Sequence, residues 1–66
     1  MIQSILFDRS RWNVNDAKHW LQTHNHKIQK VDITENFLRF RQAKPDRSKY
    51  YFTKKMGNGI ELIIMN

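Results

Sequence analysis

The chain has 66 residues, of which 39% are hydrophobic, and twelve lysines and arginines against six acidic residues give it a formal charge of +6. This length allows one domain with a small core, and the apolar content is too high for a disordered tail. The absence of cysteine excludes disulfides and thiolate metal sites. The positive charge favours a polyanionic partner, such as nucleic acid or an acidic protein surface, although charge of this size also serves solubility alone.

The N-terminal segment predicts neither a signal peptide nor a membrane span, because its short apolar run ends at Asp8. We therefore expect a soluble protein that is intracellular or enclosed in a particle. The first predicted element is a short strand over residues 4–7, in which Ile5 and Phe7 share a face. Residues 8–11 then turn the chain.

A helix is predicted to begin at Val14, because Asn13 is a good N-terminal cap and Asp16 lies near the positive end of the helix dipole. Asn25 is expected to end the helix, since asparagine tolerates the left-handed conformation. One face of the helix carries four apolar residues at helical spacing, which are Val14, Ala17, Trp20 and Leu21. His24 continues this face. This face predicts packing against a sheet, with His24 partly buried.

Four further strands are predicted after the helix, over residues 27–34, 36–42, 50–56 and 60–65. The first two of these strands are joined by a hairpin-like step. The polar loop over residues 43–49 contains Pro45, which cannot donate to a ladder. The last two strands flank Gly57-Asn58-Gly59, the strongest turn signal in the chain, because these residues tolerate the positive φ that hairpin turns require.

The sequence thus predicts an α+β fold in one domain over residues 1–66, with the order β-α-β-β-β-β and the helix packed on one face of a small, mostly antiparallel sheet. Leu38 and Phe40 are expected to point to the core, because side chains alternate along a strand. The alternating positions form a second face that mixes apolar groups with cations: Phe37, Arg39, Arg41, Tyr51, Thr53, Lys55, Ile63 and Met65. We expect function at this second face.

Nucleic-acid binding is one hypothesis for the second face. Arg39 and Arg41, with Lys55 expected on a neighbouring strand, carry charge that can neutralise phosphates without reading sequence. Phe37 and Tyr51 carry rings that can stack on exposed bases. The loop over residues 43–49 adds candidate phosphate contacts at Lys44, Arg47 and Lys49. An alternative stays open, because exposed arginines also serve solubility or edge protection and a phenylalanine can simply pack beneath their stems.

Self-association is a second hypothesis for the same surface. Ile63 and Met65 lie off the core side of the last strand, and Ile2 adds to them, so these three residues form a candidate dimer interface. Two copies are expected to pair through their last strands or their sheet faces, with two-fold symmetry. A homodimer is expected because association is one of the few stabilising routes open to a small chain.

Several short runs form a distinctive pattern together: Trp12-Asn13-Val14, Ala17, Trp20-Leu21, His24, Lys27, and Leu38-Arg39-Phe40-Arg41-Gln42 with Pro45. This pattern resembles a small, largely uncharacterised domain of tailed phages and of giant DNA viruses such as marseilleviruses. The resemblance implies a viral protein that is packaged in the virion, is dimeric, and resides in the host cytoplasm or nucleus during infection. The related domains usually carry Thr or Ser at the position of Asn13 and Gly at that of Asn25, which keeps the same capping chemistry. The family has no established activity to carry over.

No catalytic or metal-binding pattern is present in the sequence. His19 and His24 are five residues apart and fall on different sides of a helix, so they lack the spacing of helical zinc sites. Pro45-Asp46 resembles the start of a nuclease motif, but the acidic-x-Lys element that should follow is absent. We therefore expect a protein that is not an enzyme, binds no cofactor, metal or membrane, and acts on nucleic acid or an acidic viral partner. The alternative is a structural or assembly protein of the virion that acts only through protein contacts.

Overall fold

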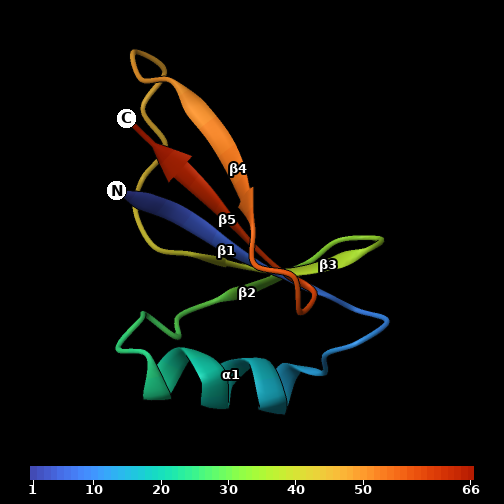
Figure 1. The fold of residues 1–66 in the computed structure, drawn as a ribbon. Coiled ribbons are helices and arrows are strands. Elements are labelled where there is room, and N and C mark those ends of the chain that lie inside the picture. The colour runs from blue at the N-terminus through green and yellow to red at the C-terminus, as the bar shows by residue number, and fades with distance from the viewer.

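The computed structural model describes all 66 residues as one helix laid against a five-stranded sheet (Figure 1). The elements in chain order are β1 (Ile2–Asp8), α1 (Val14–Thr23), β2 (Val31–Ile33), β3 (Phe37–Arg41), β4 (Tyr51–Lys55) and β5 (Ile60–Met65). This arrangement confirms the predicted α+β class. The first strand is longer than predicted, whereas β2 is shorter and residues 27–30 form an irregular segment before it.

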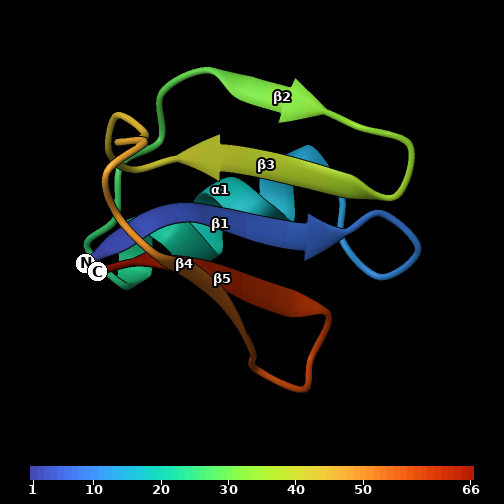
Figure 2. The same ribbon diagram turned by 90° about the horizontal axis from the view of Figure 1, so that it is seen from above.

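The sheet has the strand order β2-β3-β1-β5-β4, and every neighbouring pair is antiparallel. Its centre is therefore made by the first and last strands, and its edges are β2 and β4 (Figure 2). The connection from β3 to β4 passes the start of β1, where the carbonyl oxygen of Gln3 accepts bonds from Gln42 N at 2.7 Å and Ala43 N at 3.2 Å. This crossing puts β3 and β4 on opposite sides of the sheet centre.

The helix begins and ends where its capping residues predict. The Asn13 side chain accepts a bond from Asp16 N at 2.7 Å, and Asn25 adopts a positive φ of 60° just after the last turn. His24 differs from the prediction that it is partly buried at the end of the apolar face. His24 is exposed, and its ring stacks on the half-buried Trp20 indole with centroids 3.9 Å apart.

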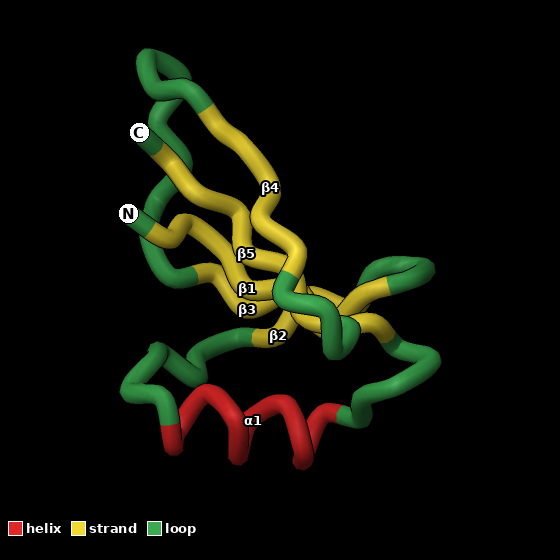
Figure 3. The backbone as a smooth tube through the Cα atoms, viewed as in Figure 1, coloured by secondary structure: helices red, strands yellow, loops and turns green.

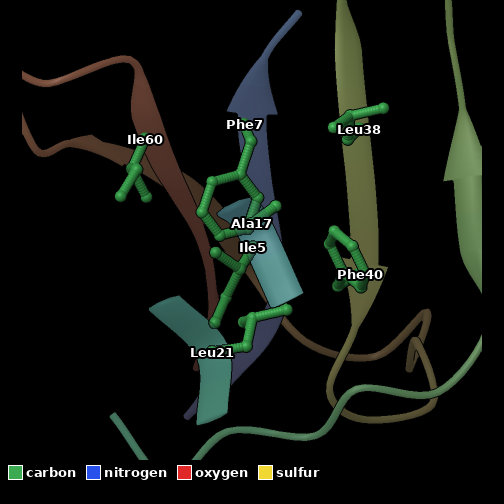
Figure 4. Close-up of a cluster of buried hydrophobic side chains, with 7 residues drawn as sticks. All are labelled: Ile5, Phe7, Ala17, Leu21, Leu38, Phe40 and Ile60. Carbon is green, nitrogen blue, oxygen red and sulfur yellow. The ribbon is translucent and has the colours of Figure 1, made fainter. Parts of the chain in front are cut away.

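The hydrophobic core lies between α1 and the central strands, and Figure 4 shows its buried members. They are Ile5, Phe7, Ala17, Leu21, Leu38, Phe40 and Ile60. Phe7 connects the two layers through edge-to-face contacts, with ring centroids 5.1 Å from Trp12, 5.7 Å from Trp20 and 5.6 Å from Phe40. Leu38 and Phe40 thus point to the core as the alternation in β3 predicts.

The β4–β5 hairpin turns through two glycines with positive φ, 89° at Gly57 and 84° at Gly59. The turn is docked to the chain before the helix, because the Trp12 indole N–H donates to the carbonyl oxygen of Asn58 at 2.9 Å. The close approach of Trp12 explains why a residue without a side chain follows Asn58.

The helix covers only part of the sheet, because β4 and the adjoining ends of β5 and β1 curve away from it (Figures 1 and 3). On the helix side of this curved part, the register places Ile2, Ile64 and Phe52 next to one another across three strands. Phe52 keeps 50% of its surface exposed, and Ile2 and Ile64 are half-buried. These three residues form an apolar row on this side of the sheet, in which Ile2 packs against the hydrophobic core and Phe52 is the most exposed.

Candidate nucleic-acid interface

The open face of the sheet, which is the face turned away from α1, carries the mixed apolar and cationic set expected from the sequence. The register of the four ladders places the following residues on it: Phe37, Arg39, Arg41, Tyr51, Thr53, Lys55, Ile63 and Met65. Their positions along the strands, however, separate them into groups that do not act on one another. The open face is therefore not a single binding platform.

Lys55 is far from the arginines of β3. The register aligns five residues in one row across the open face: Asp32, Arg39, Leu6, Glu61 and Lys55. Two strands thus lie between Arg39 and Lys55, and the prediction that Lys55 occupies a neighbouring strand is wrong. Lys55 has the carboxylate residue Glu61 as its cross-strand neighbour instead, because the sheet places β5 beside β4.

Asp32 on β2 stands beside both arginines of β3. Its Oδ2 atom lies 3.1 Å from Arg39 Nη2 and 4.0 Å from Arg41 Nη2. One carboxylate cannot neutralise two guanidinium groups, so this trio keeps a net positive charge, and the Arg41 side chain remains 52% exposed. The Nε atom of Arg39 is buried without a hydrogen-bond partner. Arg41 is therefore the freer of the two cations.

The role of Asp32 was missed in the sequence, although a signal for it exists. Val31 and Ile33 alternate with Asp32, so Asp32 must face away from the core. An antiparallel step between β2 and β3 then sets it opposite a residue on the same face, and the observed partner is Arg39. The alternation that identified the outward arginines thus also identifies their counter-ion.

The two aromatic rings proposed for base stacking lie at opposite corners of the open face. Phe37 pairs with Asp8 at one end of β1, whereas Tyr51 pairs with Met65 at the far end of β5. The Tyr51 hydroxyl is held by the loop, because it donates to the carbonyl oxygen of Asp46 at 2.8 Å and lies 3.3 Å from the Met65 sulfur. The structure does not bring these rings together.

The loop over residues 43–49 is ordered by a turn at Asp46. The Asp46 carboxylate accepts bonds from the Ser48 backbone N–H at 2.9 Å and the Ser48 hydroxyl at 2.7 Å. These bonds hold the pKa of Asp46 below its usual value near 3.8. The loop keeps its three cations, Lys44, Arg47 and Lys49, exposed. Of the three, Lys44 adjoins the end of β3.

Four cations gather where the segment before β2 meets the end of β3, and we call them the cationic cluster: Lys27, Lys30, Arg41 and Lys44. They line two adjoining surface hollows of about 300 and 180 Å³, which share Arg41 and Gln29 as a common wall. Asp32 is the one carboxylate in either lining. The structure thus brings together Arg41 and Lys44 from the predicted set and adds Lys27 and Lys30.

The Gln42 side chain positions the segment that carries the two additional lysines. Its Oε1 atom accepts a bond from Lys27 N at 2.8 Å, and its Nε2 atom donates to the carbonyl oxygen of Lys27 at 3.0 Å. The Gln42 side chain thus makes the two hydrogen bonds that a backbone residue of a neighbouring strand would make, and it holds the irregular segment at the end of β3. Composition and strand alternation carry no signal for this contact, because residues 27–30 do not form a strand.

The three residues expected at a dimer interface do not share a surface. Ile63 is half-buried on the open face, and Met65 is buried, with 7% of its surface exposed. Ile2 pairs with Ile64 and so lies on the helix side. Pairing through the last strands is also wrong, because β5 has β1 on one side and β4 on the other and has no free edge.

No group of three metal-ligating side chains lies together in the structure. The single helix, α1, has ten residues and falls short of a bilayer span. Comparison of the chain with protein-family models, with curated proteins and with solved structures finds no match. The viral resemblance of the short sequence runs therefore stays a prediction.

Proposed function

We propose that this chain is a small non-enzymatic module that binds the phosphate backbone of nucleic acid without reading its sequence, and that it does so at the cationic cluster. The observation that carries the proposal is the pair of adjoining hollows lined by four cations and one carboxylate, with Arg41 between them. Arginine donates in a fixed fork that suits phosphate oxygens, and lysine contributes a mobile point charge.

The adjoining hollows suit a chain of anions better than a single anion. Arg41 reaches both hollows, whereas Lys30 lines one of them and Lys44 the other. A ligand with successive negative charges can occupy both hollows and neutralise all four cations. If each of the four cations contacts one phosphate, the association constant for duplex DNA falls with a slope of about −3.6 in log K against log salt, at roughly 0.9 per contact.

Base recognition is not part of the proposal. Phe37 and Tyr51 lie at opposite corners of the open face, and neither lines the hollows of the cationic cluster. Without rings beside the cations, no stacking contribution supports a preference for single strands. The oligonucleotide sequence should not change the affinity, and a duplex should bind at least as tightly as a single strand, because each phosphate contact on the duplex releases more counterions.

Fluorescence anisotropy with labelled duplex and single-stranded oligonucleotides at two salt concentrations tests the proposal. Lys44→Ala should weaken binding several-fold and reduce the salt slope by about one contact. Lys18→Ala is the matched control, because Lys18 is an exposed lysine of α1 that lines neither hollow. The absence of binding at low salt, or an equal loss in both variants, would overturn the proposal.

A second candidate is an assembly protein that acts only through protein contacts, with the virion as its setting on the strength of the sequence resemblance. The observation that favours it is the apolar row of Ile2, Ile64 and Phe52, in which Phe52 keeps 50% of its surface exposed, together with the exposed side chains of β4. Small proteins that expose contiguous apolar surface commonly use it for interaction. Binding of purified capsid or core proteins, with no affinity for oligonucleotides at low salt, would favour this candidate.

A further inference from the structure

The outer side of β4 is a free sheet edge whose backbone groups have no partner. Asn66 N donates to Tyr50 O at 2.9 Å, and Met56 N donates to Ile60 O at 2.8 Å, so the even-numbered residues of this hairpin bond inward. In an antiparallel pair the intervening residues point their N–H and C=O groups the other way. Tyr51, Thr53 and Lys55 therefore present these groups outward from an edge strand whose side chains are all exposed.

The two edges of the sheet differ in what they offer. β2 has three residues and is preceded by an irregular segment, so it offers a short template. β4 has five residues, with the aromatic pair Tyr51 and Phe52 at one end and the cationic pair Lys54 and Lys55 at the other. Lysines on an edge strand commonly oppose unwanted pairing. In β4 the two lysines occupy only the C-terminal end of the strand. An antiparallel copy of β4 would place its Tyr51 and Phe52 opposite these lysines.

We propose that β4 pairs antiparallel with β4 of a second copy of this chain, about a two-fold axis at Thr53. With Thr53 opposite the partner's Thr53, Tyr51 stands opposite the partner's Lys55, and the converse holds by symmetry. Every outward N–H and C=O group of Tyr51, Thr53 and Lys55 then has a hydrogen-bond partner in the other copy of β4. An axis at Tyr51 or at Lys55 would leave some of these groups without a partner in β4. The two sheets join into one.

Side-chain chemistry favours a second copy over an unrelated extended peptide. On one face Tyr51 meets the partner's Lys55, and on the other Phe52 meets the partner's Lys54, so each cation faces an aromatic ring rather than another cation directly opposite. This match of cations with aromatic rings requires a partner strand that has the sequence of β4 and runs antiparallel to it. The aliphatic stem of the partner's Lys54 also extends the apolar row over Phe52.

Cysteine cross-linking locates the axis, because the natural chain has no cysteine. Residues opposite one another in a hydrogen-bonded antiparallel pair have Cα atoms about 5.5 Å apart, within the range of about 4.4–6.8 Å that a disulfide spans. Thr53→Cys should therefore form a covalent dimer on mild oxidation. Met56→Cys is the control, since exposed Met56 lies just beyond the paired residues and six residues of rise would separate it from its copy by roughly 20 Å. Equal cross-linking of the two variants would overturn the proposed register.

Sedimentation velocity measures the dimer without a cross-link. Thr53→Pro removes the N–H at the axis but leaves the inward bonds to β5, so the dimer dissociation constant should rise at least about tenfold while circular dichroism stays unchanged. Thr53→Val keeps the N–H and should leave the constant within about twofold. A parent chain that stays monomeric throughout the micromolar range would overturn the proposal, and titration with poly-glutamate would then show whether the edge takes an acidic strand instead.

Salt separates this proposal from the proposed function. The partner's Lys54 is a diagonal neighbour of Lys54 in this register, so salt should strengthen the dimer or leave it unchanged. The same salt should weaken oligonucleotide binding at the cationic cluster. A failure of one proposal therefore leaves the other measurable.

Discussion

Asp32 Oδ2 lies 3.1 Å from Arg39 Nη2 and 4.0 Å from Arg41 Nη2, so one carboxylate restrains the two arginines of β3. Replacing it frees both guanidinium groups for phosphate. We expect Asp32→Asn to raise oligonucleotide affinity several-fold and to steepen the salt slope by up to about one contact. The variant should lose no more than about 1 kcal/mol of folding stability, because the pair is partly exposed to solvent.

Glu35→Gln is the matched control for that experiment. It removes the same charge from the exposed turn between β2 and β3, where Glu35 makes no ion pair. Its effect on affinity should be smaller than that of Asp32→Asn at every salt concentration. Equal effects would show that net charge, rather than release of the arginines, governs binding.

Gly59 and Gly57 share a positive φ but differ in the space around them. A Cβ at Gly59 would lie 3.1 Å from Arg11 Cδ and 3.3 Å from Trp12 Nε1, whereas one at Gly57 meets nothing within 4 Å. We expect Gly57→Ala to cost about 1 kcal/mol from its backbone conformation and Gly59→Ala about 2 kcal/mol or more, since it also displaces the indole from Asn58. Urea denaturation of both variants measures the difference, and equal costs would contradict the docking of Trp12 on the turn.

Trp20 stabilises the fold from a half-buried position. Its indole contacts Phe7 edge-to-face at 5.7 Å and carries the His24 ring at 3.9 Å. Trp20→Ala should cost about 2–3 kcal/mol, below the roughly 3–5 kcal/mol of a fully buried aromatic residue. His24→Ala removes the outer stacking contact together with the hydrogen bond between His24 Nδ1 and the Trp20 carbonyl oxygen at 2.8 Å, and it should cost about 1 kcal/mol. An unfolding midpoint of Trp20→Ala equal to that of the parent would contradict the packing of α1 on the sheet.

Acid should weaken the two turns that Asp8 and Asp46 build. Backbone and hydroxyl bonds from Ser10 and Ser48 lower the pKa of these carboxyl groups below about 3.8 in the folded chain. A carboxyl group whose pKa is lower in the folded state stabilises the fold at pH values above its pKa in the unfolded state. This stabilisation is lost as the pH falls through the pKa of the folded state. The free energy of unfolding should therefore decline below about pH 4, and less steeply in Asp46→Asn than in the parent. Glu35→Gln, as the control, should follow the parent curve more closely than Asp46→Asn does.

The sequence predicts the helix and the β4–β5 hairpin well because both depend on local chemistry. Asn13 caps the helix, Asn25 ends it with a positive φ, and Gly57 and Gly59 turn the hairpin. Each of these signals acts within a few residues, so no knowledge of the tertiary structure is needed to interpret it.

The strand order could not be predicted from the sequence, because the neighbour of each strand depends on contacts between distant parts of the chain. The prediction placed Lys55 beside the arginines, whereas the chain crosses from β3 to the far side of β5. The cationic cluster was missed for a related reason. It depends on the bonds from the Gln42 side chain to Lys27, which join segments far apart in the sequence and leave no periodic pattern.

The pairing of β1 with β5 at the centre of the sheet also bears on how the chain acquires its structure. Ile5 pairs with Leu62 and Phe7 with Ile60, so the middle of the sheet joins residues from opposite ends of the 66-residue sequence. Such distant contacts raise the contact order and slow folding relative to a helical protein of this size. During translation, Ile5 and Phe7 of β1 cannot form their pairs with β5 until β5 has left the ribosome. A nascent chain stalled before Ile60 would therefore expose the edges of β1 and β4 between which β5 lies in the folded sheet.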